Sequence, residues 1–248
     1  MRFYIDDTSF IETNEPLDLS IGLCSGEENL RAWYVDPPRF EPVRANGFLG
    51  SVAEGGNVNF RNVFFNPHGH GTHTECCGHI TNEVYSVNKH LKNYFFRATL
   101  ITVEPQLLEN GDSVIFPHHL TNRINADFSE AIIIRTIPND LDKTSKDFSN
   151  SNPPYLDVSL VEYLNALNVE HLLIDLPSVD KELDGGVLAF HHAFWNVPES
   201  PILNRTITEL VYANSSIADG NYILELQVAP FENDASPSRP VLYKIEKK

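Results

Sequence analysis

Residues 157–178 read DVSLVEYLNALNVEHLLIDLPS and combine a helix with a buried strand. The helix presents one apolar face, with i, i+3, i+4, i+7 spacing, made of Leu160, Tyr163, Leu164 and Leu167. Asp157 or Ser159 is expected to cap its start, because short polar side chains accept bonds from the first helical N–H groups. VEHLLIDLPS (169–178) then has the apolar composition of a strand that is covered on both faces.

Two earlier segments extend this pattern into a sheet. FRATLITVEP (96–105) and AIIIRT (131–136) are short, β-branched and bounded by breakers. A strand, a helix and a second strand in this order predict parallel pairing. The segment 206–231 predicts two further strands with a tight turn at Asp219-Gly220. Polar residues 138–152 predict a long exposed loop.

The predicted fold class is therefore α/β: one mixed domain over residues 1–248, with a strand-rich sheet and flanking helices. Its length is enough to bury a core without disulfides or metal. Alternating apolar residues from Val58 to Phe65 predict one more strand, which runs into a segment rich in glycine and histidine.

The net charge of the chain limits its partners. Acidic residues outnumber basic ones 34 to 18, which gives a formal charge of -16. Such a surface repels phosphate backbones and anionic lipid, so we expect neither nucleic acid nor membrane as a partner. Three cysteines make no disulfide framework, and the first twenty residues lack an apolar signal region. We therefore expect a cytoplasmic protein.

The segment HGHGTHTECCGH (68–79) carries the chemistry. Four histidines and a glutamate fall within these 12 residues: His68, His70, His73, Glu75 and His79. Imidazole and carboxylate groups are the ligands that zinc, manganese and iron accept. In an extended segment His73 and Glu75 project to the same face, so that the pair can share a metal. Gly69, Gly71 and Gly78 permit close backbone approach or positive φ.

Other interpretations of the same segment are a solvent-exposed histidine loop without metal, a structural zinc site, or a cupin-type site. The cupin interpretation is disfavoured because the glycines that frame such a motif are missing. Cys76 and Cys77 could supply thiolate ligands, but buried packing is the commoner role for such residues.

Several motifs together resemble the cyclase family of metal hydrolases, which includes kynurenine formamidase and isatin hydrolase. GTHTECCGH (71–79) is similar to the family segment G-T-H-x-D-x-P-x-H, and LLIDLPSVDKE (172–182) to G-x-D-x-x-S-x-D. Weaker matches occur in the family's order, so that the resemblance runs from about residue 16 to the C-terminus: PLDLSIGL, AWYVDPP, AIIIRT, FHHAFW, ITEL and ASPSRPVL.

The resemblance implies roles for individual residues. It makes His73 a metal ligand, Glu75 the acidic residue that bridges two metals, and His79 the catalytic histidine. His191, or its neighbour His192, stands where a second-metal histidine belongs. Glu209 matches a glutamate that also holds the metals. Asp175 and Ser178 are either further metal ligands or, with Asp180, residues that orient ligands or close the core, and the second role is favoured. Trp33 and Tyr34 would wall the substrate.

The motif also departs from the family pattern. The first ligand histidine of the family falls on Gly69, flanked by His68 and His70. A one-residue bulge could present His68 instead, and His70 stays open as the replacement. Glu75 is one methylene longer than the aspartate of the family. A longer segment, NVPESPILNR, separates His191 from Glu209.

The resemblance implies a hydrolase that uses one or two zinc or manganese ions to cleave a carboxamide: a formamide, a lactam, or a related cyclic amide or ester. A metal-activated water would attack the carbonyl, with His79 as general base and acid. Arylformamidase activity in tryptophan catabolism, on a small-molecule substrate, and a homodimer or larger homo-oligomer follow from the same relatives. Alternatives on the same scaffold are a non-catalytic binding protein and a metal-dependent lyase or dehydratase.

Overall fold

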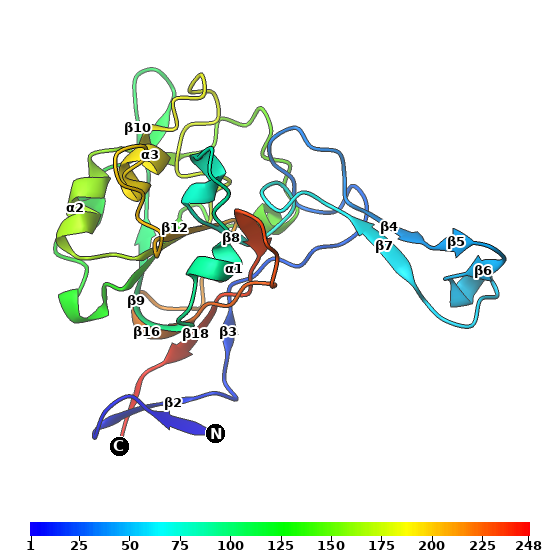
Figure 1. Cartoon of the computed structure of the whole chain (residues 1–248). Coiled ribbons are helices and arrows are strands. Elements are labelled where there is room, and N and C mark those ends of the chain that lie inside the picture. Colours follow the sequence, from blue (N-terminus) through cyan, green and yellow to red (C-terminus); the bar gives the residue numbers. More distant parts are fainter.

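The computed structural model describes residues 1–248, and its centre is a nine-stranded mixed sheet (Figure 1). The strand order is β17-β8-β15-β14-β12-β9-β16-β18-β3. The bounds are β3 (Leu17–Asp18), β8 (His73–Glu75), β9 (Phe95–Val103), β12 (Ala131–Thr136), β14 (His171–Ile174), β15 (Thr206–Glu209), β16 (Gly220–Glu225), β17 (Ala235–Pro237) and β18 (Val241–Lys244).

The middle of this sheet is parallel, as predicted. β12 pairs in parallel with β9 on one side and with β14 on the other, and β14 pairs in parallel with β15. All six residues of β12 are buried, because side chains cover both faces of the strand. The mixed α/β class expected from the sequence is confirmed.

Three α-helices accompany the sheet: α1 (Val87–His90), α2 (Leu160–Ala166) and α3 (Ala189–Trp195). α2 is the predicted helix, and it buries Leu160 and Leu164 in the largest apolar cluster, which also contains Phe194 of α3. Of the two predicted capping residues, Ser159 makes no side-chain cap bond. Asp157 does, because its Oδ1 accepts the N–H of Ser159, which has helical φ and ψ, at 3.0 Å. None of the helices is long and apolar enough to cross a membrane.

The hairpin predicted at Asp219-Gly220 is wrong. β15 and β16 both form, but β15 lies between β8 and β14, whereas β16 lies between β9 and β18. Asp219 anchors the start of β16 against its real neighbour, since its carboxylate accepts the N–H of Thr102 in β9 at 2.8 Å. Gly220 begins the strand with φ 151°. The Asp-Gly pair therefore starts a strand between two others.

Short elements complete the periphery. A three-stranded sheet joins the two chain ends, and a second small sheet lies beside the body. Their bounds, with those of the 3-10 helices, are β1 (Arg2–Tyr4), β2 (Ser9–Glu12), β19 (Glu246–Lys247), β10 (Gln106–Leu107), β11 (Ser113–Ile115), β13 (Tyr155–Leu156), η1 (Val52–Glu54), η2 (Cys77–Ile80), η3 (Pro117–His119), η4 (Ala126–Phe128) and η5 (Leu141–Thr144). The predicted loop 138–152 is largely exposed, but it contains η5 and the buried Phe148.

Residues 39–64 form an arm that projects from the rest of the molecule (Figure 1). It consists of β4 (Arg39–Pro42) paired with β7 (Arg61–Phe64), and of β5 (Arg44–Ala45) paired with β6 (Phe48–Leu49). β7 falls within the strand predicted from Val58 to Phe65. Several large apolar side chains of the arm are exposed: Phe48, Val52, Val58, Phe60, Val63 and Phe64.

Candidate metal centre

The strand β8 brings the central residues of the histidine-rich segment into the sheet. It runs antiparallel between β15 and β17, and its register places His73 opposite Glu209 of β15. His73 and Glu75 are two residues apart, so they project to the same face, as predicted from the sequence. All three side chains are buried. An imidazole and two carboxylates therefore meet on one face of two adjacent strands.

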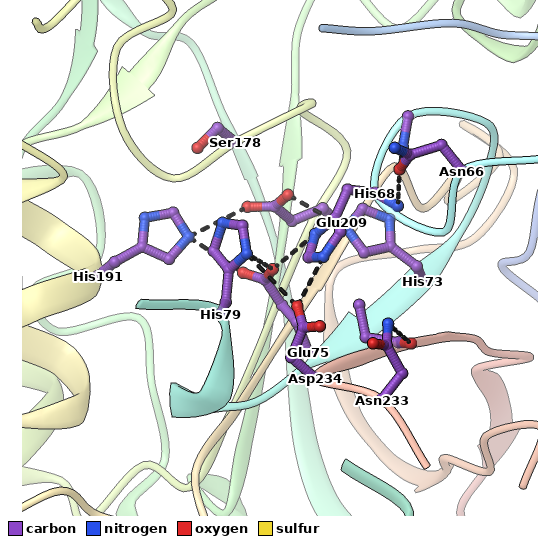
Figure 2. A network of polar contacts seen from close by, with 12 residues as sticks. Asn66, His68, His73, Glu75, His79, Ser178, His191, Glu209, Asn233 and Asp234 are labelled. Atoms are coloured by element: carbon purple, nitrogen blue, oxygen red, sulfur yellow. Dashed lines mark hydrogen bonds and ion pairs between the residues drawn. The ribbon is translucent and has the colours of Figure 1, made fainter. Parts of the chain in front are cut away.

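Two groups of metal-ligand type share Glu75 (Figure 2). In the first, ligand atoms of His73, Glu75 and Glu209 lie within 4.8 Å of one another. In the second, the same holds for His68, Glu75 and His79. His191 reaches the shared carboxylate from α3, with its Nε2 3.0 Å from Glu75 Oε1. The structure thus brings together residues from three distant stretches of chain.

Three of these imidazoles use one ring nitrogen outside the cluster. His73 Nδ1 donates to the carbonyl oxygen of Gly71 at 3.0 Å. His191 Nδ1 and His68 Nε2 bond to carboxylates, at 2.6 Å from Asp180 Oδ2 and at 2.8 Å from Asp234 Oδ2. The other nitrogen of each ring then faces a buried carboxylate, which is Glu75 for His68 and His191 and Glu209 for His73. Histidines that bind metals show this arrangement, because the outer bond fixes the tautomer and the ring orientation.

Two buried polar atoms at the centre have no hydrogen-bond partner: His73 Nε2 and Glu75 Oε2. His68 Nδ1 lies 3.0 Å from Glu75 Oε2, but this contact is not aligned as a hydrogen bond. A buried polar atom without a partner costs about 1–3 kcal/mol. A cation between these atoms would satisfy both, so the residues present fit a divalent ion with nitrogen and oxygen ligands.

The electrostatics of the cluster favour positive charge. Burial by itself lowers the pKa of His191, but hydrogen bonds to Asp180 and Glu75 outweigh it and raise that pKa to about 10. For His68, burial also lowers the pKa, but the hydrogen bond to Asp234 and the negative charge of the adjacent Glu75 outweigh it and raise that pKa to about 10. Despite its burial, the neighbouring imidazoles hold the pKa of Glu75 well below its usual range. The carboxylates therefore stabilise positive charge between these side chains, either as protonated imidazoles or as a bound metal ion.

His68, and not residue 69, reaches the shared carboxylate of Glu75, because position 69 has room only for a glycine. A Cβ on residue 69 would lie 2.9 Å from Val35 Cγ2 and 3.1 Å from the carbonyl oxygen of Ala32. No larger residue fits there without a shift, because the segment 32–35 packs directly on the glycine. Asn66 turns the chain just before it, with its Oδ1 accepting the N–H of His68 at 2.9 Å. His68 is thereby directed at Glu75 from a turn rather than from a strand bulge.

The ring of His70 points away from the cluster. Its Nδ1 accepts the N–H of Asn66 at 2.7 Å, and its Nε2 donates to the carbonyl oxygen of Asp36 at 2.8 Å. With both nitrogens occupied, the ring braces the turn that directs His68. Of the two candidates flanking Gly69, the structure brings only His68 to the acidic residues.

His192 and Asp175 also lie outside the cluster. The Nδ1 of His192 lies 3.1 Å from the carbonyl oxygen of Val197, and His192 belongs to neither group of metal-ligand type. Asp175 is buried in a separate ion pair, with its Oδ2 2.9 Å from Lys143 Nζ. Ser178 borders the cavity beside the cluster but joins neither group (Figure 2).

A cavity of about 320 Å³ opens onto the cluster. Its lining residues are Trp33, Asn66, His68, His79, Ser178, Lys181, Glu182, Asp184, Leu188, His191 and Glu209. Of the two aromatic residues predicted to wall the substrate, Trp33 lines this cavity. Tyr34 does not line the cavity; it is 55% exposed, and its hydroxyl donates to Glu182 at 2.8 Å. Both aromatic residues have positive φ, 62° and 59°, so this rim is a tight, strained turn.

Asp234, directly beside the cluster, is the residue of the site that sequence reasoning missed. Its Oδ2 lies 2.8 Å from His68 Nε2 and 3.5 Å from His79 Nδ1 (Figure 2). It comes from the loop before β17, directly before the segment ASPSRPVL that resembles the family. The available signal was an acidic residue adjoining a matched motif.

Comparison with known proteins identifies the family. The family model described as "Putative cyclase" matches residues 17–181. The chain belongs to this cyclase family. The matched range includes the histidine-rich segment with His68, His73, Glu75 and His79.

Relatives extend the likeness of this cyclase-family chain beyond the matched range. Kynurenine formamidase of Bacillus thuringiensis is 26% identical over 244 residues, which covers 95% of this chain and 100% of that protein. Isatin hydrolase A from Ralstonia solanacearum has a TM-score of 0.64 at 15% identity, and covers 92% of this chain and 91% of its own. A structure titled a potential metal-dependent hydrolase with cyclase activity has a TM-score of 0.62 at 13% identity, with 93% and 98% covered. The two structures share the fold.

Proposed function

We propose that this cyclase-family protein is a metal-dependent hydrolase that cleaves a carboxamide with activated water. The observation that carries the proposal is the sharing of Glu75 by two groups of ligand type beside a cavity. The orphaned nitrogen of His73 and the orphaned oxygen of Glu75 support a bound cation. The names of the relatives support hydrolysis.

The proposed ligands follow the two groups that share Glu75. His73, Glu75 and Glu209 would hold one divalent ion, with His191 Nε2 close to both of these carboxylates, and His68 and Glu75 would hold a second. Nitrogen and oxygen ligands of this kind suit zinc or manganese. When bound, such ions lower the pKa of a coordinated water to about 7 and polarise the substrate carbonyl.

His79 is the proposed acid and base. Its side chain is 31% exposed and lines the cavity, so a substrate can reach the ring. There the imidazole would take the proton of the attacking water and pass it to the leaving nitrogen. Asp234 Oδ2, 3.5 Å from His79 Nδ1, would orient the ring. Trp33 would pack on the substrate and exclude water.

The proposed substrates are formamides, lactams and related cyclic amides or esters. Kynurenine formamidase and isatin hydrolase are both named for cleavage of a carboxamide, open in one and cyclic in the other. A cavity of about 320 Å³ holds a small molecule of one or two rings. An arylformamidase-like reaction in tryptophan catabolism is the most specific form of this proposal.

The test combines metal analysis with product release. Purified protein would be assayed for zinc and manganese, and for formate, ammonia or acid release from aryl formamides, lactams and esters. We expect bound metal and hydrolysis of at least one carboxamide class, with both lost in His73→Ala. His192→Ala is the matched control, because that ring lies outside the cluster. Metal without hydrolysis would favour a binding protein, and elimination products a lyase; either result would overturn the proposal.

We also propose that the protein is a homo-oligomer assembled through the arm. A two-stranded arm with six exposed apolar side chains is marginal in water unless a partner covers it. The arm carries three arginines and two glutamates in a chain of net charge -16, so its charge complements the body of a second copy. Light scattering should show at least a dimer, and Phe48→Ser with Phe60→Ser a monomer. Phe3→Ser, exposed but outside the arm, is the control. A monomeric wild type would refute this proposal.

A further inference from the structure

Asp234 is held at the cluster by its backbone. Its carbonyl oxygen accepts the N–H of Cys76 at 3.0 Å, directly after β8. The next residue, Ala235, pairs with Glu75 in the register of β17 and β8. The loop before β17 is therefore fixed to the strand that carries Glu75, and the side chain of Asp234 is 24% exposed. Its position does not depend on what its carboxylate binds.

The carboxylate of Asp234 bonds to the outer nitrogen of His68. Asp234 Oδ2 lies 2.8 Å from His68 Nε2, while His68 Nδ1 lies 3.0 Å from Glu75 Oε2. One ring thus spans two acids, one at the centre of the cluster and one behind it. Figure 2 marks both contacts of the His68 ring, one to Glu75 and one to Asp234.

A second imidazole of the cluster has the same arrangement. His191 Nε2 faces Glu75 Oε1 at 3.0 Å, and its Nδ1 bonds to Asp180 Oδ2 at 2.6 Å. Asp180 also accepts the N–H of Phe190 at 2.8 Å, so it fixes both the ring and the start of α3. Carboxylates behind metal-binding histidines hold the ring in one orientation, and their loss weakens metal binding about 10–100-fold.

We infer that Asp234 is the positioning residue that makes His68 a metal ligand in place of the histidine that Gly69 cannot supply. The inference rests on the proposed metal centre. His68 reaches Glu75 from a turn at the cavity edge, without a strand to hold its ring. The bond to Asp234 supplies that restraint. Sequence position 68 and position 234 therefore act as one unit.

The experiment measures the dissociation constants of zinc and of manganese for the metal-free full-length protein, by competition with a chromophoric chelator. The variants are Asp234→Ala, Asp234→Asn, His68→Ala and the double variant Asp234→Ala with His68→Ala. Glu232→Ala is the matched control, because it removes one negative charge from the same loop and its carboxylate contacts Lys89 and Asn88 rather than the histidine cluster. Thermal unfolding of each metal-free variant checks that it is folded.

We expect Asp234→Ala to weaken one of the metal-binding steps about 10–100-fold. Asp234→Asn should lose less, because its amide oxygen still accepts a bond from the ring, and it also tests the inference if the alanine variant is unstable. The double variant should bind metal no more weakly than His68→Ala, because both substitutions act on the same ligand, the His68 ring. Glu232→Ala should bind like the wild type.

Two results would overturn the inference while leaving the metal centre intact. One is wild-type affinity in both Asp234 variants. The other is a double variant whose loss is the product of the two single losses, because Asp234 would then act independently of His68. A wild-type protein that binds neither zinc nor manganese would instead refute the proposed function, and the inference with it.

Discussion

Replacement of Gly69 by alanine tests the reason why His68 serves in place of the family ligand. The added Cβ would lie 2.9 Å from Val35 Cγ2 and 3.1 Å from the carbonyl oxygen of Ala32. Overpacking of this kind costs about 1–3 kcal/mol. The lower backbone entropy of the unfolded variant returns about 0.4–1 kcal/mol. Gly71→Ala is the matched control, since its Cβ would meet only the carbonyl oxygen of Ile21, at an ordinary 3.4 Å.

Urea unfolding of the metal-free variants measures the difference. Gly69→Ala should be less stable than Gly71→Ala by about 1–3 kcal/mol, because both share the entropy gain and only one is overpacked. Val35→Ala removes the closer methyl group, so the two changes should couple favourably, by about 0.5 kcal/mol or more in a double-mutant cycle. Equal stabilities of the two glycine variants would refute the steric reasoning.

Three further predictions concern separate residues. His79→Ala should keep the bound metal and lose about 10²–10⁴ in turnover; joint loss of metal and turnover would make His79 a ligand, as its place beside His68 and Glu75 also permits. Burial lowers the pKa of His171 to about 3, so the folded protein binds fewer protons than the unfolded chain between about pH 3 and 6.5. Metal-free wild type should therefore lose up to about 1.4 kcal/mol of unfolding free energy per pH unit, relative to His171→Gln, as the pH falls below 6.5; a difference independent of pH in urea titrations would contradict this. Lys143→Met should cost about 3–5 kcal/mol, because it leaves the buried Asp175 carboxylate, 2.9 Å from Lys143 Nζ, without its cation. Adding Asp175→Asn should restore most of that loss, and failure to do so would place the cost elsewhere.

The parallel core was predictable because its signals are local. In the helix 157–168 and in the strands around it, the spacing of apolar residues fits only one type of secondary structure. The helical connection between two strands then makes those strands parallel. The hairpin at Asp219-Gly220 failed for the opposite reason. Whether an Asp-Gly pair closes a turn depends on which group its carboxylate contacts. Here the N–H of Thr102, on the neighbouring strand β9, donates to Asp219.

The candidate site was predictable only in part. The common face of His73 and Glu75 follows from strand alternation, and the resemblance supplied His191 and Glu209. The choice between His68 and His70 depended on a turn at Asn66. Asp234 reaches the cluster because β17 pairs with β8, and no local pattern in the sequence predicts this long-range pairing.

Glu75 provides the most direct test of the metal centre, because it belongs to both ligand groups. The measurement is the number of zinc or manganese ions bound per chain in the wild type and in Glu75→Ala, determined by elemental analysis after saturation and desalting. We expect one or two ions in the wild type and none in the variant. A wild type without metal, or a variant that keeps the full number of ions, would contradict the account.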